Sequence, residues 1–242
     1  MALNLQTFKT RTLTAIGFAA VMLVGLLWNF WSFLILCTII HFGCWYEFVK
    51  LLKKIYGVKY LPYCLFGLVY ISMPVIMLLN LYLNAIDGMS HSPGCLTQSN
   101  QVYTYTSHLP VLAIKPAFII FSIWINDTMA YIVGSLIGKN PLSKISPKKT
   151  WEGTIGGILI TIIIAAIISK IVMDEFCAGW ILIAAISAIF GTFGDLLESK
   201  IKRMADVKDS GSFLPGHGGF LDRFDSLLVA TPFVWLYVKI FL

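Results

Sequence analysis

The stretch from Thr12 to Tyr46 contains no Asp, Glu, Lys or Arg. A membrane-crossing helix needs about 20 mostly apolar residues, so this uncharged run is too long for one crossing and long enough for two. Near its middle, Trp28-Asn29-Phe30-Trp31 has the aromatic and polar residues that are typical of a turn at the membrane interface. The run therefore predicts two membrane-spanning helices, at 13–28 and 30–48.

The composition of the whole chain agrees with this prediction. Of the 242 residues 58% are hydrophobic and 12% are charged, and the mean hydropathy is +0.82, whereas soluble domains carry about 25% charged residues. A disordered chain, a disulfide-stapled mini-protein and an ordinary water-soluble enzyme are thereby excluded. The five cysteines form no C-x-x-C pair and have no zinc-site spacing. The net charge is +6, but we expect no nucleic-acid partner, because in a membrane chain the location of each charge matters more.

Further apolar segments follow at 61–83, 109–137, 154–172, 180–197 and 226–242. Pro74 lies inside the first of these and predicts a kink. The segment 109–137 runs through Asn126-Asp127 in its middle, so it is either one long helix broken at membrane depth or two shorter helices. The distribution of basic residues, described next, favours one crossing.

Lys and Arg residues are enriched in short cytoplasmic loops. They occur at 9–11, 50–59, 139–149 and 200–223, whereas the connections at 29, 84–108 and 173–179 contain none. This alternation predicts seven crossings, with the N-terminus inside and the C-terminus outside. Two crossings within 109–137 would break the alternation.

Two cysteines fall in the connections that we place on the outer side, Cys95 in 84–108 and Cys177 in 173–179. They could form a disulfide in an oxidising compartment. We favour the alternative, in which they are two unrelated small hydrophobic residues.

The charged residues are concentrated between Asp195 and Asp225, which hold between them six of the 12 acidic and five of the 18 basic residues. Asp195 lies at the end of an apolar helix, and Ser199 and Lys202 follow four and seven residues later, on the same helical face. Asp222 and Asp225 are three residues apart at the entry of the last span. Carboxylates at a membrane boundary are costly unless they are paired or bind a metal, so this segment is the expected functional site.

Two carboxylate-bearing helix ends, joined by a loop with Lys, Arg, His and several glycines, predict a site for Mg²⁺ and polyphosphate. Mg²⁺ typically takes one or two carboxylates plus phosphate oxygens. Glycines let backbone N–H groups approach phosphate, and Lys and Arg offset its charge. The alternative is a solvated loop attracted to anionic lipid headgroups, which explains the basic residues but not the acidic ones beside them.

Two blocks of sequence sharpen this prediction. The first consists of Ser199-Lys200-Ile201-Lys202-Arg203, Lys208-Asp209 and Leu214-Pro215-Gly216-His217-Gly218-Gly219-Phe220-Leu221-Asp222-Arg223-Phe224-Asp225. The second consists of Trp124, Asn126-Asp127-Thr128, Ala130-Tyr131, Gly134, Gly138-Lys139 and Ser146-Pro147-Lys148-Lys149-Thr150-Trp151-Glu152-Gly153. The first resembles the signature of the phosphatidate cytidylyltransferases, also called CDP-diacylglycerol synthases, and the second is similar to that family's other recurrent stretch. Together with Gly194-Asp195, the resemblance covers roughly residues 110–242.

The resemblance implies an enzyme that transfers CMP from CTP to phosphatidic acid, giving CDP-diacylglycerol and pyrophosphate, with Mg²⁺ or another divalent metal as cofactor. It also implies a homodimer. We expect an all-α, polytopic membrane bundle of about seven to nine transmembrane helices, some of them broken, with a polar cavity facing the cytoplasm. Residues 1–108 would supply packing and lipid or dimer contacts, and residues 109–242 would form the catalytic domain, with the signature at 199–225. The active site would lie on the cytoplasmic side of the membrane, which in a bacterium is the inner membrane.

Spacing and resemblance together suggest the following site residues. The metal ligands are Asp195 and Asp222, with Asp225 next, and Lys202 and Arg223 join them as catalytic residues. Substrate-binding residues are Ser199, Arg203, Lys208, Asp209, His217, Asn126, Asp127, Lys148 and Lys149.

Less specific interpretations exist for several of these side chains. The basic residues of 202–223 could form salt bridges to nearby acids, and His217 could only fix the loop. Asp127 could cap a helix beside Thr128, and Lys148 and Lys149 could be simple positive-inside residues. For the whole protein, the alternatives are a related cytidylyltransferase or kinase acting on an isoprenoid lipid and, less favoured, a membrane transporter.

Overall fold

The computed structural model describes residues 5–87, 114–173, 178–213 and 218–241. The regular elements in these ranges are helices, and an isolated β-bridge joins Pro141 to Thr150. The long helices are α1 (Leu5–Leu27), α2 (Phe30–Tyr56), α4 (Met73–Asp87), α5 (Ile114–Ile137), α6 (Trp151–Met173), α7 (Ala178–Met204) and α8 (Leu221–Phe241). Short turns fill the segment between α2 and α4: η1 (Gly57–Lys59), η2 (Leu61–Tyr63), α3 (Cys64–Gly67) and η3 (Leu68–Ser72). The described residues contain 6 helical segments long and apolar enough to cross a membrane, and α1 adds the shorter apolar stretch Thr14–Leu27. The prediction of an all-α, multi-pass membrane protein is confirmed.

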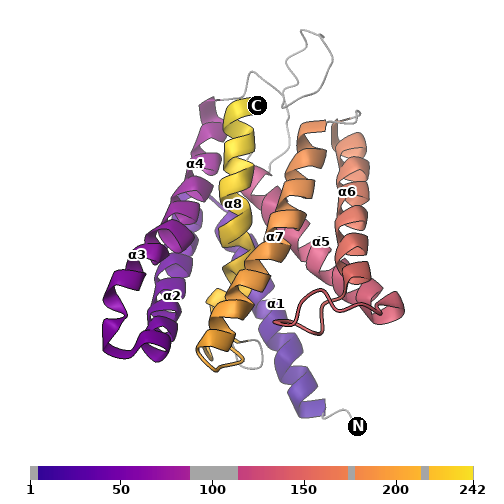
Figure 1. Ribbon diagram of the computed structural model, residues 1–242. Helices are drawn as coiled ribbons and strands as arrows, with labels where there is room; N and C mark the ends of the chain where they lie inside the picture. Colours follow the sequence, from indigo (N-terminus) through magenta and orange to yellow (C-terminus); the bar gives the residue numbers. More distant parts are fainter. Residues whose placement is uncertain (1–4, 88–113, 174–177, 214–217, 242) are drawn as a thin grey trace.

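The helices run between two ends of the molecule, with the N-terminus at one end and the C-terminus at the other (Figure 1). The segments 57–63, 138–150 and 205–213 all lie at the end where α1 begins (Figure 1). Lys and Arg lie in these connections or at the helix ends beside them: Lys53, Lys54 and Lys59, then Lys144, Lys148 and Lys149, then Lys202, Arg203 and Lys208. The arrangement agrees with an odd number of crossings and gathers the predicted cytoplasmic segments at one end.

The turn between α1 and α2 is fixed by a capping box. Asn29 accepts a hydrogen bond from the backbone N–H of Ser32 at 2.8 Å, and the Ser32 hydroxyl accepts one from the backbone N–H of Asn29 at 3.0 Å. These reciprocal bonds satisfy N–H groups that a helix start otherwise leaves without partners. The turn predicted at Trp28-Asn29-Phe30-Trp31 is confirmed.

The irregularity expected at Pro74 takes the form of a π-helical turn, η3, just before α4. Pro74 has no N–H with which to bond the preceding turn. The N–H of Met73 donates to the carbonyl of Leu68, five residues back, which widens the helix at this point.

The break predicted at Asn126-Asp127 is wrong, because α5 is continuous from Ile114 to Ile137. Asn and Asp cost only a few tenths of a kcal/mol in a helix interior, roughly, so they do not interrupt one by themselves. The Asn126 amide donates to the Thr192 hydroxyl of α7 at 3.4 Å, which gives this polar side chain a partner outside its own backbone. The single crossing that the basic residues favoured is therefore present.

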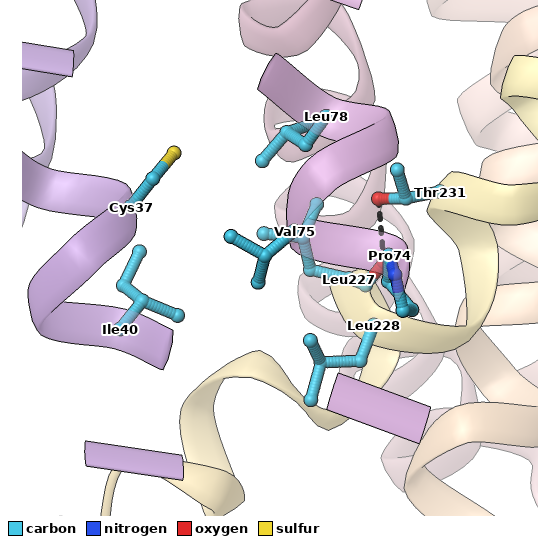
Figure 2. Close-up of a pocket in the computed structure, with 8 residues that line it drawn as sticks. All are labelled: Cys37, Ile40, Pro74, Val75, Leu78, Leu227, Leu228 and Thr231. Carbon is cyan, nitrogen blue, oxygen red and sulfur yellow. Dashed lines mark hydrogen bonds between the residues drawn. The ribbon is translucent and has the colours of Figure 1, made fainter. Parts of the chain in front are cut away.

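Helices from both halves of the chain share one hydrophobic core, which includes Phe33, Tyr82, Ile119 and Leu221. Figure 2 shows α2, α4 and α8 meeting around an apolar void of about 10 Å³, which is lined by Cys37, Ile40, Pro74, Val75, Leu78, Leu227, Leu228 and Thr231. The Thr231 hydroxyl donates to the Leu227 carbonyl at 2.7 Å, so it adds no free polar group to the void. An apolar void of this size stays dry and is not a ligand site. The domain boundary that we predict at 108/109, like Cys95 and Cys177, lies outside the described residues.

Candidate active site

The site forms where α7 and α8 pack closely together. A Cβ atom on Gly194 would meet the backbone carbonyl oxygen of Asp225 and would lie 2.9 Å from the Cα atom of Ser226. Only glycine allows the two backbones to come this close without displacement. Because Asp195 follows Gly194, its carboxylate comes within electrostatic range of Asp225 on the facing helix.

Asp195 joins the two blocks that carry the sequence resemblance. Lys149 Nζ lies 2.5 Å from Asp195 Oδ2, and the exposed fractions of the two side chains are 29% and 30%. The Ser199 hydroxyl, one turn further along α7, donates to Asp195 Oδ1 at 3.2 Å. The 138–150 connection therefore reaches the signature through Asp195, which pairs with Lys149 and bonds to Ser199, the first residue of the signature.

Asp225 lies deeper than Asp195, with 7% of the residue exposed. Its Oδ1 accepts a hydrogen bond from the Ser226 N–H at 2.7 Å, and the charges that act on it include those of Asp127 and Lys149. Nearby on α5, Asn126 is 2% exposed, and its Oδ1 has no hydrogen-bond partner among the described residues. Leaving a buried oxygen without a hydrogen-bond donor costs free energy of folding. The Asn126 Oδ1 atom is therefore available as a hard oxygen ligand at this part of the site.

A second charged centre lies around Lys202. Its Nζ bonds to Asp222 Oδ1 at 2.6 Å and forms an ion pair with Glu198, which is fully buried. Asp222 Oδ2 accepts hydrogen bonds from the Ser210 N–H at 2.9 Å and from the Gly219 N–H at 2.7 Å. It also lies 2.9 Å from the Ser210 hydroxyl oxygen, whose single proton has Glu47 Oε2 as its nearer acceptor. Asp222 thus connects the end of α7 and the start of α8 with the signature loop, the connection at 205–220, of which the structure describes 205–213 and 218–220.

Gly218 provides the backbone conformation that this arrangement needs. Its φ angle of +85° lies in the left-handed region, which side chains disfavour. A Cβ atom there would also lie 2.6 Å from Asp222 Oδ2. Glycine at 218 therefore leaves the Asp222 carboxylate free to reach the loop N–H groups.

Glu47 on α2 is a site residue that the sequence analysis missed. It is 3% exposed and accepts hydrogen bonds from the Ser210 hydroxyl and from the backbone N–H groups of Phe220 and Leu221. It is the single acidic residue in 1–86, inside an apolar helix. An isolated carboxylate at membrane depth is a functional signal by itself, and that signal could have found it.

Most of the other predicted residues have exposed side chains. Asp127 and the five residues Lys148, Arg203, Lys208, Asp209 and Arg223 are exposed. Arg203 Nη1 donates to the Val207 carbonyl at 3.2 Å. His217 lies outside the described residues.

The site offers carboxylate oxygens that could bind Mg²⁺. In 5–87, 114–173, 178–213 and 218–241, no group of three or more His, Cys, Asp or Glu side chains is placed to hold a metal ion. Asp195 and Asp225 nonetheless present neighbouring hard oxygen ligands, which suit a cation that takes one or two carboxylates plus phosphate oxygens. Both oxygens of Asp222 already accept hydrogen bonds. The residues fit a site that the substrate phosphates complete, and the three-carboxylate ligand set stays a prediction.

Comparison with known proteins identifies the family. A model of the cytidylyltransferase family matches residues 58–241, about three quarters of the chain. The chain belongs to this family. The matched segment contains both sequence blocks that carry the resemblance and both charged centres, but it begins after Glu47.

Individual relatives agree with the resemblance found in the sequence. Phosphatidate cytidylyltransferase from Bacillus subtilis (strain 168) is 46% identical over 121 residues, which are 49% of this chain and 45% of that protein. The protein of that name from Haemophilus influenzae is 38% identical over 146 residues, 58% of this chain and 50% of that protein. Phosphatidate cytidylyltransferase 4, chloroplastic, from Arabidopsis thaliana is 45% identical over 114 residues, 47% of this chain and 29% of that protein. The chain thus matches half or less of the length of these relatives.

Proposed function

We propose that this protein is a phosphatidate cytidylyltransferase, which transfers CMP from CTP to phosphatidic acid and releases pyrophosphate. The observation that carries the proposal is the ion pair between Lys149 and Asp195, because it brings the two family-like blocks into one site. Lys202 of the second charged centre follows Asp195 by seven residues, about two turns further along α7, and pairs there with Asp222 of α8. The names of the relatives support the choice of substrates.

The reaction requires two anions to approach each other. An oxygen of the phosphatidate phosphate attacks the α-phosphorus of CTP, a new P–O bond forms, and the bond to pyrophosphate breaks. The attacking phosphate is already an anion near neutral pH, so a strong general base is not needed. Charge repulsion is the larger barrier, and positioned cations lower it.

This chain supplies cations on several sides of the site. Lys202 is held between two carboxylates, Glu198 and Asp222, which fix its position for contact with a phosphate oxygen. We assign the exposed basic residues Lys148, Arg203, Lys208 and Arg223, together with Lys149, to the phosphates of CTP or phosphatidate. Ser199 and His217 would donate hydrogen bonds to the same groups, and Asp209 would hold Lys208 or an arginine in place.

We propose Mg²⁺ as the cofactor, held by Asp195, Asp222 and Asp225, with Asn126 and Asp127 lining the polar cavity beside it. The unpartnered Asn126 oxygen and the neighbouring carboxylates support this assignment. When bound, the metal would neutralise phosphate charge and stabilise the departing pyrophosphate. Asp195 would then exchange its present partner, Lys149, for the metal.

The proposal extends to the setting of the protein. The protein spans a membrane several times. We propose that its active site faces the cytoplasm, at the inner membrane if the source is a bacterium, and that it works as a homodimer with phosphatidic acid, CTP and the bilayer as partners and no nucleic acid.

The decisive experiment measures release of pyrophosphate from CTP by the purified protein in detergent, with and without Mg²⁺ and phosphatidic acid. Release that requires both lipid and metal is the expected result. An isoprenoid lipid phosphate that replaces phosphatidic acid would reassign the acceptor. Release of CDP with a lipid alcohol would instead indicate a kinase. If the folded protein does not turn over CTP with any of these lipids, that result would contradict an enzymatic role and favour a transporter.

A further inference from the structure

Glu47 is a buried carboxylate that accepts hydrogen bonds from the signature loop and from the first residue of α8. Its Oε2 accepts from the Ser210 hydroxyl at 2.6 Å and from the Leu221 N–H at 2.9 Å, and its Oε1 accepts from the Phe220 N–H at 3.0 Å. An unpaired carboxylate in an apolar helix costs several kcal/mol, roughly, so these bonds explain why the residue can stay buried there. Glu47 and the signature loop therefore depend on each other.

The loop needs an acceptor at the start of α8. Phe220 precedes the first residue of the helix, at the position where Ser, Thr, Asp or Asn usually caps the exposed N–H groups. Phenylalanine has no acceptor, and Glu47 supplies one from α2. A negative carboxylate at this end of a helix is also favoured by the helix dipole.

The loop is shaped to admit this carboxylate. A Cβ atom on Gly211 or on Gly219 would collide with the Glu47 carboxylate oxygens. Both positions lie within the signature segment. The close approach of both glycines to the Glu47 carboxylate therefore excludes larger residues at these two positions.

Ser210 connects Glu47 to the proposed active site. Its hydroxyl oxygen lies 2.6 Å from Glu47 Oε2 and 2.9 Å from Asp222 Oδ2. The Ser210 N–H also donates to Asp222 Oδ2 at 2.9 Å. A shift of Glu47 would therefore shift donors that orient Asp222, the acid that pairs with Lys202.

We propose that Glu47 is a positioning residue: from α2, outside the family-matched segment 58–241, its carboxylate holds the signature loop and, through Ser210, orients Asp222. Glu47 itself touches no reacting atom. The proposal rests on the proposed function for its effect on turnover, and on the described contacts for its effect on the loop. It makes α2 part of the catalytic unit, beyond the packing and lipid contacts expected of residues 1–108.

The kinetic test compares Glu47→Gln with wild type and with the control Tyr46→Phe, whose side chain lies on the same helix and is 73% exposed. Glutamine keeps the size of Glu47 but points an amide N–H₂ at a backbone N–H or at Ser210. We expect kcat to fall by about 10- to 100-fold, the usual effect of losing a residue that orients a ligating group. The KM for CTP should change less than kcat, since Glu47 does not contact substrate, and Tyr46→Phe should match wild type. An unchanged kcat in folded Glu47→Gln would overturn the proposal.

A double-mutant cycle with Ser210→Ala separates positioning from general stabilisation. If Glu47 acts through Ser210, the double variant should lose about as much activity as the worse single variant, because both remove the same connection. Independent losses that multiply would contradict the connection. If Glu47→Gln fails to fold, Ser210→Ala still tests the connection between Glu47 and Asp222. That variant keeps the hydrogen bonds from the Phe220 and Leu221 N–H groups to Glu47.

Hydrogen exchange tests the loop contact independently of activity. In Glu47→Gln, the amides of residues 218–224 should exchange at least about 10-fold faster than in wild type, because they lose acceptors at the start of α8. Tyr46→Phe should exchange like wild type. Unchanged exchange in Glu47→Gln would overturn the proposal even if activity falls. Absence of pyrophosphate release from wild type would instead count against the proposed function, and exchange would then decide the role of Glu47 in holding the loop.

Discussion

Asp222 illustrates how a carboxylate near the membrane boundary is stabilised by several hydrogen-bond donors at once. Lys202, the Ser210 N–H and the Gly219 N–H all donate to it. Such bonds to a charged group are each worth about 1.5–3 kcal/mol. The same bonds fix the carboxylate in one orientation, which a reaction that depends on charge placement requires.

Asp222→Asn should reduce pyrophosphate release by at least about 100-fold, because the amide removes the negative charge from the centre of the site. Folding should stay near normal: asparagine has the same size, its oxygen can still accept from the loop, and Lys202 keeps Glu198. The matched control is Asp206→Asn, an exposed residue with a φ angle of +51°, a conformation that asparagine tolerates. Steady-state assays and thermal unfolding in detergent check both variants, and normal turnover in Asp222→Asn would remove the centre of the proposed function.

Lys149→Ala should mainly raise the apparent KM for CTP or phosphatidic acid, by about 10- to 100-fold. The expected size follows from the loss of one charge-assisted hydrogen bond of about 1.5–3 kcal/mol to phosphate. The control is Lys144→Ala, an exposed lysine of the same connection, which should leave both constants unchanged. Equal effects of the two substitutions would show that only the general positive charge of the connection matters.

The individual site residues differ in how far the sequence could predict them. Helical spacing correctly placed Asp195 and Ser199 on one face, where they bond to each other. Alternation of basic residues put Lys149 on the same side as Asp195, but its direct ion pair depends on how α6 and α7 pack. Glu47 lies 163 residues before Ser210 in sequence, and no local pattern contains a contact of that range.

At the level of helices, small residues decide which faces can meet. Gly157 of α6 is one example: a Cβ atom there would lie 2.9 Å from the Ala130 nitrogen of α5, so the two helices come into close contact at this glycine. The predicted break in α5 failed for a different reason. Polar residues in an apolar helix were taken as a sign of lost backbone bonds, whereas their side chains find partners on neighbouring helices, as Asn126 does with Thr192.

Gly194→Ala tests the role of the close contact between α7 and α8. The added methyl group would meet the backbone of Asp225, so the helices must separate, at a cost of about 1–3 kcal/mol. Thermal unfolding in detergent should occur several degrees lower, roughly, and activity should fall because Asp195 and Asp225 move apart. Gly17→Ala on α1 is the control: no atom lies within 4 Å of the added Cβ, so a neutral or slightly stabilising effect is expected. Equal stability of the two variants would contradict this role of Gly194.

For the molecule as a whole, the sequence predicted the class and the direction of the chain better than the contacts between its parts. Apolar length and the alternation of basic residues reflect the physics of a single helix in a bilayer, which local sequence contains. The shared core of Phe33, Tyr82, Ile119 and Leu221 joins residues from both halves of the chain. Packing of this kind depends on side-chain shapes that are distant in sequence, so it could not be predicted from composition or periodicity.

The orientation in the membrane follows from the same charge distribution and can be tested directly. The connections at 57–63, 138–150 and 205–213 lie together at one end, whereas α7 begins at the opposite end (Figure 1). If the basic end faces the cytoplasm, where CTP is available, Lys144→Cys should react with a membrane-impermeant maleimide only after cells are opened. Ala178→Cys, at the exposed start of α7, should react in intact cells.

Both labels belong in a background without the five native cysteines, checked for pyrophosphate release so that the labelled protein is the active one. The two positions control each other, because a leaky membrane would label both and a poorly exposed position would label in neither condition. Labelling of Lys144→Cys alone in intact cells would place the charged site on the outer face. That result would overturn the proposed cytoplasmic active site, since the ion pairs of Lys149 and Lys202 lie at the same end as residue 144.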